Sequence, residues 1–234
     1  MGERKTFFST VLLVGVIIGV AAGSVALADS TSKTGLIAFT RGEGSGQEIV
    51  IYNPTTSSER QLTYNNVWDG LPVWSPSGRW LAFVRAIPDR GTLTKHDFVL
   101  NERDEILVAD QDSGNLICIG KSAHTEPYEL GGCAEYWPEI PPLAGVTNLC
   151  WTQDETGILF EAPCSVTNDL ILRMDVPSGE LHLLCLGNDL RSLGQGRFIV
   201  WRHEYDEYGG YNRSYVIDPW GNVLSTPPHA DQQK

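Results

Sequence analysis

The stretch from Leu71 to Arg85, LPVWSPSGRWLAFVR, decides the fold of this chain. Two apolar arms flank a short turn, and each arm carries a bulky aromatic residue. Pro76 presets the backbone angle that the second position of a type I turn requires, and Gly78 can take the left-handed conformation that closes the turn onto an antiparallel partner. The stretch therefore predicts a tight β-hairpin.

Parts of this hairpin recur along the chain. The related segments are Trp151–Phe160, Gly35–Phe39 and Gly196–Val200. A second piece follows each copy and consists of an apolar run, an Asp or Asn, a short turn and a further strand. Its copies are Ile49–Asn53, Ile106–Asp110, Ile171–Asp175 and Tyr215–Asp218. Two-part copies that return in the same order indicate a repeat array.

The strands of these repeats indicate sheets that are covered on both faces. The run Ile49–Tyr52 is apolar throughout and lacks the alternation of a sheet with one wet face. Gly, Pro and β-branched residues interrupt every window with helical spacing after residue 30. We therefore expect an all-β fold, a small β-propeller of about four blades, either closed or left open and incomplete. The first copy begins with its second arm, so its first strand must come from elsewhere in the chain.

At this point the pattern resembles that of a known family. Leu71–Phe83 is similar to the TolB-type (WD40-like) β-propeller repeat, whose usual form is Pro-x-Trp-Ser-Pro-Asp-Gly-x-x-Ile-Ala-Phe. Later strands of that family look like Ile49–Asn53 and Arg60–Thr63 here, and the copies together cover most of residues 35–225. The resemblance implies a propeller fold. Such repeats occur in periplasmic partner-binding proteins and in the propeller domains that cover serine peptidases.

Two residues depart from the family pattern. Ser77 stands where the family usually has Asp, and Glu155 stands where it usually has Gly. Asp154 keeps the acidic place in the third copy. The resemblance therefore implies the fold more firmly than the function.

The first residues of the chain have the features of an export signal. Arg4 and Lys5 precede an apolar core, and Ala26-Leu-Ala28 forms an Ala-x-Ala site, which predicts a signal peptide over residues 1–28, cleaved after Ala28. The alternative is an uncleaved anchor, because residues 7–28 are long enough to span a bilayer. Either way the folded part is expected outside the cytoplasm, whether periplasmic, secreted or membrane-anchored.

The remaining boundaries follow from composition. We expect a linker over residues 29–34, a TolB-like domain over 35–226 and a flexible tail over 227–234. A stretch rich in Pro and Gly over residues 121–147 is expected to be an insertion that covers a rim or acts as a lid.

The charge of the chain excludes some partners. The net charge is −12 at pH 7, and loss of the leader would make it slightly more negative. Nucleic acid and anionic membrane surfaces both require a basic face, so neither is expected as a partner. Contact with a membrane is expected only through residues 7–28, if they are not cleaved. A protein partner in the cell envelope or outside the cell remains compatible with the charge.

Five cysteines in an exported chain suggest disulfides with one thiol left over. Cys150 and Cys164 flank the third copy, and Cys118 and Cys133 bracket the insertion, so Cys150–Cys164 and Cys118–Cys133 are the candidate pairs. The sequence does not fix this connectivity. No Cys-x-x-Cys motif occurs, so neither a thioredoxin-like site nor a zinc ribbon is indicated.

Few residues point to chemistry. Gly42–Gly46 has the wrong spacing for the Gly-x-Ser-x-Gly elbow of a serine hydrolase. The acidic run that contains Glu204 and Asp206 suggests either a site for a hard cation or a solvated loop. Trp68 and Asp69 precede the organising hairpin, and they either line one mouth of the ring or pack between blades. A weak candidate binding rim therefore consists of Trp68, Asp69, Asp154, Glu204 and Asp206.

These observations together favour a non-enzymatic, extracytoplasmic propeller that acts as a protein-binding or scaffold module. No catalytic residue, metal or cofactor is predicted. One alternative is an enzyme that acts on polysaccharide at the central channel, which would require convergent His, Arg and carboxylate groups. Another is a ligand-sensing domain, if the leader remains as an anchor.

Overall fold

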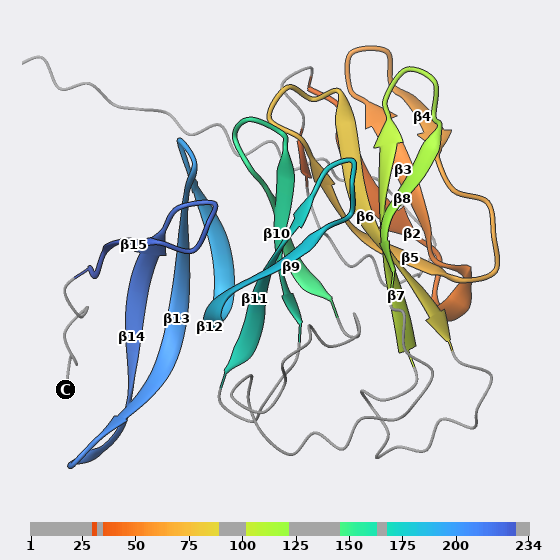
Figure 1. Ribbon diagram of the computed structural model, residues 1–234. Helices are drawn as coiled ribbons and strands as arrows, with labels where there is room; N and C mark the ends of the chain where they lie inside the picture. Colours follow the sequence, from red (N-terminus) through yellow and green to blue (C-terminus); the bar gives the residue numbers. More distant parts are fainter. Residues whose placement is uncertain (1–29, 32–34, 89–101, 122–145, 163–167, 228–234) are drawn as a thin grey trace, which may run out of the picture.

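The computed structural model describes residues 30–31, 35–88, 102–121, 146–162 and 168–227. These residues form antiparallel strands, together with one short 3-10 turn at Gly44–Gly46 (η1). Figure 1 shows the sheets side by side as an open fan that does not close into a ring. The predicted all-β propeller, open and with about four blades, is therefore confirmed.

The first two blades are separate four-stranded sheets. Blade 1 consists of β1 (Ser30–Thr31), β2 (Ile37–Arg41), β3 (Glu48–Asn53) and β4 (Ser58–Gln61). Blade 2 consists of β5 (Trp68–Trp74), β6 (Trp80–Pro88), β7 (Glu102–Asp110) and β8 (Leu116–Lys121). The first strand of blade 1 comes from the residues directly upstream of the repeat, within the expected linker, and pairs Ser30 with Ala38.

Blades 3 and 4 share one strand. Their strands are β9 (Thr147–Trp151), β10 (Gly157–Ala162), β11 (Asp169–Asp175), β12 (Leu181–Gly194), β13 (Arg197–Asp206), β14 (Gly209–Ile217) and β15 (Val223–Ser225). The N-terminal half of β12 pairs with β11, and its C-terminal half pairs with β13, which joins the two blades into one seven-stranded sheet. The register shifts between Asn188 and Arg191, and Asp189 has a positive φ of 58° at this bend.

The core lies between successive blades, as the apolar strands predicted. Blades 2, 3 and 4 each turn a phenylalanine toward the blade before it. Phe83 packs on blade 1, Phe160 on blade 2 and Phe198 on blade 3, and their exposed fractions are 0%, 0% and 1%. Burial of such a ring contributes roughly 2–3 kcal/mol. A buried phenylalanine of blades 2, 3 and 4 therefore contributes to the packing of each of these blades on its predecessor.

Several predicted segments lie outside the described residues. These are the leader with its cleavage site after Ala28, nearly all of the insertion over 121–147, and the end of the tail after residue 227. Within the described part of the chain, no helix has the length and apolar character needed to cross a membrane.

Candidate functional site

The five residues of the predicted rim fall in three separate places. Trp68 and Asp69 lie on β5 of blade 2, Asp154 lies in the β9–β10 turn of blade 3, and Glu204 and Asp206 lie on β13 of blade 4. The structure does not bring these three places together into one rim.

Trp68 and Asp69 belong to the packing of blade 2. The Trp68 indole packs against the core between blades 2 and 3 and lies over Gly70, where a Cβ atom would come within 2.3 Å of the ring. Asp69 is fully buried, and its two carboxylate oxygens accept hydrogen bonds of 2.8 and 2.9 Å from the Arg85 guanidinium. The Asp69 carboxylate is therefore occupied by Arg85.

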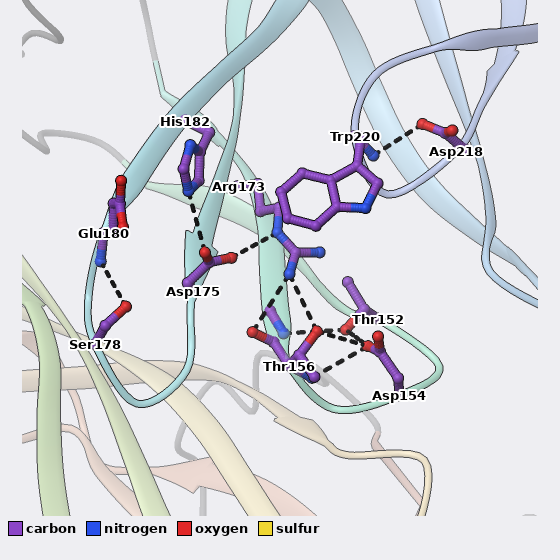
Figure 2. Close-up of polar contacts among 11 residues, drawn as sticks. Thr152, Asp154, Thr156, Arg173, Asp175, Ser178, Glu180, His182, Asp218 and Trp220 are labelled. Atoms are coloured by element: carbon purple, nitrogen blue, oxygen red, sulfur yellow. Dashed lines mark hydrogen bonds and ion pairs between the residues drawn. The ribbon is translucent and has the colours of Figure 1, made fainter.

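Asp154 organises the turn that leads into a larger polar cluster (Figure 2). Its carboxylate accepts hydrogen bonds from the Thr152 hydroxyl at 2.6 Å and from the backbone N–H and hydroxyl of Thr156 at 3.1 and 2.9 Å. The Thr152 hydroxyl, with the two donors of Thr156, holds the pKa of Asp154 below its usual value. The carboxylate is therefore ionised at neutral pH and fixes the hydroxyl of Thr156.

Arg173 is the centre of this cluster. Its Nε donates to Asp175 at 2.7 Å, and its Nη2 lies 3.1 Å from the Thr156 hydroxyl and 3.4 Å from the Thr156 carbonyl oxygen. The guanidinium covers Gly157, where a Cβ atom would lie 2.6 Å from the Arg173 Cζ. Only 3% of the Arg173 side chain is exposed. A glycine at position 157 is therefore required to admit the guanidinium.

Trp220 covers the guanidinium from blade 4. The Arg173 Cζ lies 4.0 Å from the centroid of the indole, and the His182 ring meets the same indole edge-on at 5.9 Å (Figure 2). The carboxylate of Asp218 accepts the Trp220 backbone N–H at 2.8 Å and so positions the turn between β14 and β15. A cation stacked on an aromatic face contributes about 1 kcal/mol or more when water is excluded. The cluster thus fastens blade 4 to blade 3.

Three side chains on the open side of the cluster could hold a metal ion. Asp175, Glu180 and His182 each place one donor atom within 4.8 Å of the others. However, His182 Nε2 lies 3.1 Å from Asp175, and the second oxygen of that carboxylate accepts from Arg173. Although burial opposes it, these hydrogen bonds lower the pKa of Asp175. A divalent cation would have to break the His182–Asp175 contact beside a fixed guanidinium, so the arrangement favours a structural junction over a metal centre.

The hairpin of β13 and β14 is the second notable site. β12 accompanies β13 only as far as Trp201, so the part beyond it projects from the sheet, at the lower left of Figure 1. The Asn168 side chain holds the base of this part by accepting the His203 backbone N–H at 2.8 Å and donating to the His203 carbonyl oxygen at 3.1 Å. Beyond this anchor the side chains of Tyr205 and Tyr208 are 70% and 89% exposed.

Glu204 carries a fixed negative charge on this hairpin. Its carboxylate accepts hydrogen bonds from the hydroxyls of Tyr215 and of Tyr211, the latter at 3.1 Å, and Arg213 lies 3.8 Å away. The Tyr215 hydroxyl is the main cause of a lowered pKa for Glu204. At the tip, the Asp206 carboxylate accepts the Tyr208 backbone N–H at 2.8 Å and shapes the turn. The hairpin therefore presents exposed tyrosines beside the carboxylates of Glu204 and Asp206.

The predicted Cys150–Cys164 disulfide is not supported: Cys164 lies outside the described residues, and Cys150 is a free thiol. Its side chain packs against the core between blades 3 and 4, and burial raises the pKa of the thiol to about 11. Cys185 is also a free thiol. The other candidate pair, Cys118–Cys133, includes a residue outside the described part of the chain.

Sequence reasoning missed the residues at the centre of the blade 3–4 cluster. Arg173 could have been noticed as a charged residue inside the apolar run Ile171–Met174, and Trp220 as an aromatic residue in a turn made otherwise of Pro, Gly and Asn. Nothing in the sequence indicated that these two residues meet, because they belong to different repeats.

With this geometry established, the chain can be compared with known proteins. TolB from Acinetobacter baumannii matches at a TM-score of 0.52 and 15% identity, over 85% of this chain and 42% of TolB. The fold is that of a TolB-type β-propeller. The β-propeller domain of the Trilobed protease from Pyrococcus furiosus, which has an open velcro topology, matches at a TM-score of 0.54 and 16% identity, over 86% of this chain and 56% of that one.

Dipeptidyl peptidase 4 from Porphyromonas gingivalis matches at a TM-score of 0.58 and 15% identity, over 89% of this chain and 33% of that one. The chain thus spans between a third and a little over half of the length of these three proteins. No family model matches the chain, and no curated protein sequence matches it either.

These similarities correct the predicted function. The expectation of a non-enzymatic scaffold rested on the propeller fold and on unpromising chemistry in the sequence, with a polysaccharide enzyme and a ligand sensor as alternatives. Most of the similar structures are instead peptidases, including an acylaminoacyl peptidase from Pyrococcus horikoshii and the tricorn protease. TolB shares the fold with them. The fold is therefore common to both classes and does not mark the chain as a scaffold.

Proposed function

We propose that this chain is the polypeptide-binding propeller of a peptidase system, and that the β13–β14 hairpin contacts the bound polypeptide. In this role the propeller captures an extended or unfolded chain, and the peptidase active site is contributed by another domain or another protein. The observation that carries the proposal is the pair of tyrosines, Tyr205 and Tyr208, on a hairpin that projects beyond its own sheet.

The tyrosines have the properties of contact residues. Tyrosine supplies a large, rigid and amphipathic surface at a low cost in conformational entropy, and it is enriched where proteins bind one another. An isolated exposed tyrosine requires no explanation, but two within four residues form a concentrated contact surface. The edge-on contact between the His203 and Tyr205 rings, with centroids 4.8 Å apart, orients the first of them.

The charge of the hairpin selects the polypeptide. Glu204, Asp206 and Glu207 are next to the tyrosines in the sequence, and the chain as a whole carries a net charge of −12. Complementary charge accelerates association and discriminates between partners. We therefore infer that the bound polypeptide is rich in Lys or Arg and contains apolar residues for the tyrosine rings.

Two further observations support a role with peptidases and a location outside the cytoplasm. Propeller domains of peptidases recur among the similar structures, and another similar propeller structure is that of the nidogen/laminin complex, at a TM-score of 0.50 and 11% identity. The apolar leader and the Ala-x-Ala site at Ala26–Ala28 support a location outside the cytoplasm.

The binding step can be tested with labelled peptides. Two fluorescein-labelled, unstructured 20-residue peptides of equal aromatic content, one rich in Lys and Arg and one rich in Glu, are titrated with the full chain and followed by anisotropy. We expect the basic peptide to bind and the acidic peptide not to bind. The double variant Tyr205→Ala, Tyr208→Ala should weaken binding at least about 10-fold, since contact aromatics contribute more than about 1 kcal/mol each.

The matched control is Tyr64→Ala. Its tyrosine is 76% exposed but lies between β4 and β5, far along the chain from the hairpin. This variant should bind as the wild type does. Equal binding by the double variant, or no binding of the basic peptide to the wild type, would refute the polypeptide site. The peptidase part is tested separately: complexes purified through a tag on the chain should contain a protein that a fluorophosphonate labels at an active serine.

A further inference from the structure

Each end of the fan has one sheet face that no described blade covers, whereas the corresponding face of an internal blade is covered by its neighbour. In blades 2, 3 and 4 a phenylalanine of the second strand (Phe83, Phe160 and Phe198) points to the preceding blade and is at most 1% exposed. Phe39 is the corresponding residue of blade 1. Its neighbour Ala38 points to blade 2, so Phe39 points to the opposite side, where no described blade lies and where the ring is only partly buried. The Arg41 guanidinium, 5.3 Å from the ring centroid, covers it in part.

Blade 4 has the complementary face. Phe198 and Val200 point to blade 3, so Ile199 and Trp201 point away from it. Trp201 is 37% exposed, although it lies in the middle of a sheet between β12 and β14. In blade 2 the residues on either side of Phe83, Ala82 and Val84, contact the following blade. Ile199 and Trp201 would contact a following blade in the same way.

We propose that a second copy of this chain closes the ring, with the outward face of blade 4 of each copy against the outward face of blade 1 of the other. The outward faces of blades 1 and 4 differ from each other, so each contact is heterologous. A two-fold axis along the channel closes the ring after two copies. Each junction then repeats the packing already present between blades, in which a phenylalanine meets the apolar face of the preceding blade.

The size of the array supports two copies. Four blades cover 56% of the single propeller-domain chain of the Trilobed protease. Two sets of four give a ring within the usual range of about four to eight blades. The strands of blade 1 have 2, 5, 6 and 4 residues, so its face measures about 270 Å², from the spacing between strands and the rise along them. Two junctions of this size bury about 1,100 Å² in total, which exceeds the roughly 1,000 Å² that a specific interface requires.

The oligomeric state of the full chain tests the proposal, independently of the polypeptide site. Light scattering after size exclusion and sedimentation velocity, over about 1–100 µM, should give twice the mass of one chain. Trp201→Glu and Phe39→Lys should each raise the dissociation constant at least 10-fold, because they alter opposite sides of the same junction. Tyr208→Glu, which adds the same charge at the 89% exposed hairpin tip, should leave the dimer intact.

A combined variant identifies the pairing. With Trp201→Glu and Phe39→Lys in one chain, every junction places a carboxylate against an ammonium, so dimerisation should recover. Near-ultraviolet circular dichroism shows whether each variant is folded. The wild-type mass tests the proposal even if a variant does not fold. A wild-type monomer at all concentrations overturns the proposal. A ladder of larger species, or a Phe39→Lys variant that dimerises normally, overturns the closed ring of two.

Discussion

The Glu155 carboxylate binds Ser77, and these are the two residues at which the chain departs from the TolB-type repeat. The Ser77 backbone N–H donates to one carboxylate oxygen, and its hydroxyl donates to the other at 3.1 Å. The contact joins the β9–β10 turn of blade 3 to the β5–β6 turn of blade 2. Glu155 has a φ of +61°, in the left-handed region that favours the glycine usual in the family. The strained backbone is thus offset by a contact between blades.

The Ser77–Glu155 contact predicts that the two substitutions depend on each other. Ser77→Asp places a second carboxylate against Glu155, and we expect it to lower the free energy of unfolding by about 1 kcal/mol. In a Glu155→Gly background the same change should cost almost nothing. Urea denaturation of the four proteins of this double-mutant cycle measures the coupling. Equal costs of Ser77→Asp in both backgrounds would show that the contact contributes nothing.

Removal of the buried guanidinium should weaken the packing of blade 4 on blade 3. Arg173→Ala removes the stacking on Trp220 and leaves Asp175 without its main partner, so we expect a loss of about 3 kcal/mol in the free energy of unfolding. The control is Arg191→Ala, which removes an ion pair with Asp189 whose arginine side chain is 69% exposed. That change should cost no more than about 0.5 kcal/mol. Similar losses for both variants in chemical denaturation would contradict the central role of Arg173.

A buried carboxylate predicts a pH dependence of stability. Glu161 is 4% exposed, and burial, with the charges of Asp169 and Asp189, raises its pKa above 4.5 although the Leu190 backbone N–H donates to it. Since the folded protein holds this proton more tightly than the unfolded chain, stability falls as the pH rises from 4.5 through the raised pKa. Glu161→Gln should therefore gain stability over the wild type at pH 7.5, and less at pH 4.5. Urea midpoints at both pH values provide the test, and an identical difference at the two would contradict it.

The thiol of Cys150 should react slowly in the folded protein. With a pKa of about 11, only about 0.1% of it is thiolate at pH 8, and the thiolate is the reactive form. Alkylation by iodoacetamide, followed by peptide mass spectrometry, should label Cys150 at least 10-fold more slowly in native buffer than in urea. Equal rates would contradict its burial, and recovery of a disulfide-linked Cys150–Cys164 peptide would show that Cys150 is not a free thiol.

The leader makes a prediction that requires no mutation. Cleavage after Ala28 gives a mature chain that begins with Asp29. N-terminal sequencing of exported material should return Asp-Ser-Thr-Ser. A protein that retains residues 7–28 in the membrane fraction would support the anchor instead.

The fold was predictable because its decisive signals are local. Pro76 and Gly78 specify a turn, and Phe83 and Phe160 occupy the same register position in their hairpins, so the hairpins and their buried faces follow from neighbouring residues. The continuity of β12 was not predictable, because the sequence around Gly187-Asn-Asp189 has the composition of a loop. Its pairing is set by the two sheets that it joins.

The polar clusters were less accessible to sequence reasoning, for a physical reason. Asp69 has the sequence context of an exposed residue, yet Arg85 neutralises it inside blade 2. Trp220 and Arg173 meet only because blades 3 and 4 pack at a given angle, and no local pattern encodes that angle. Glu204 was identified by its acidic neighbours, but the two tyrosines that fix its charge come from the next strand.

The single strand that serves two blades has a consequence for how this protein deforms. Elsewhere a loop separates one sheet from the next and can absorb a change in their relative orientation. Between blades 3 and 4 the hydrogen-bonded ladder runs through, so any rotation must twist the backbone near Asp189 or tear the ladder open. Blades 3 and 4 should therefore move together as one rigid unit. Changes in the relative orientation of the sheets should occur mainly at blades 1 and 2.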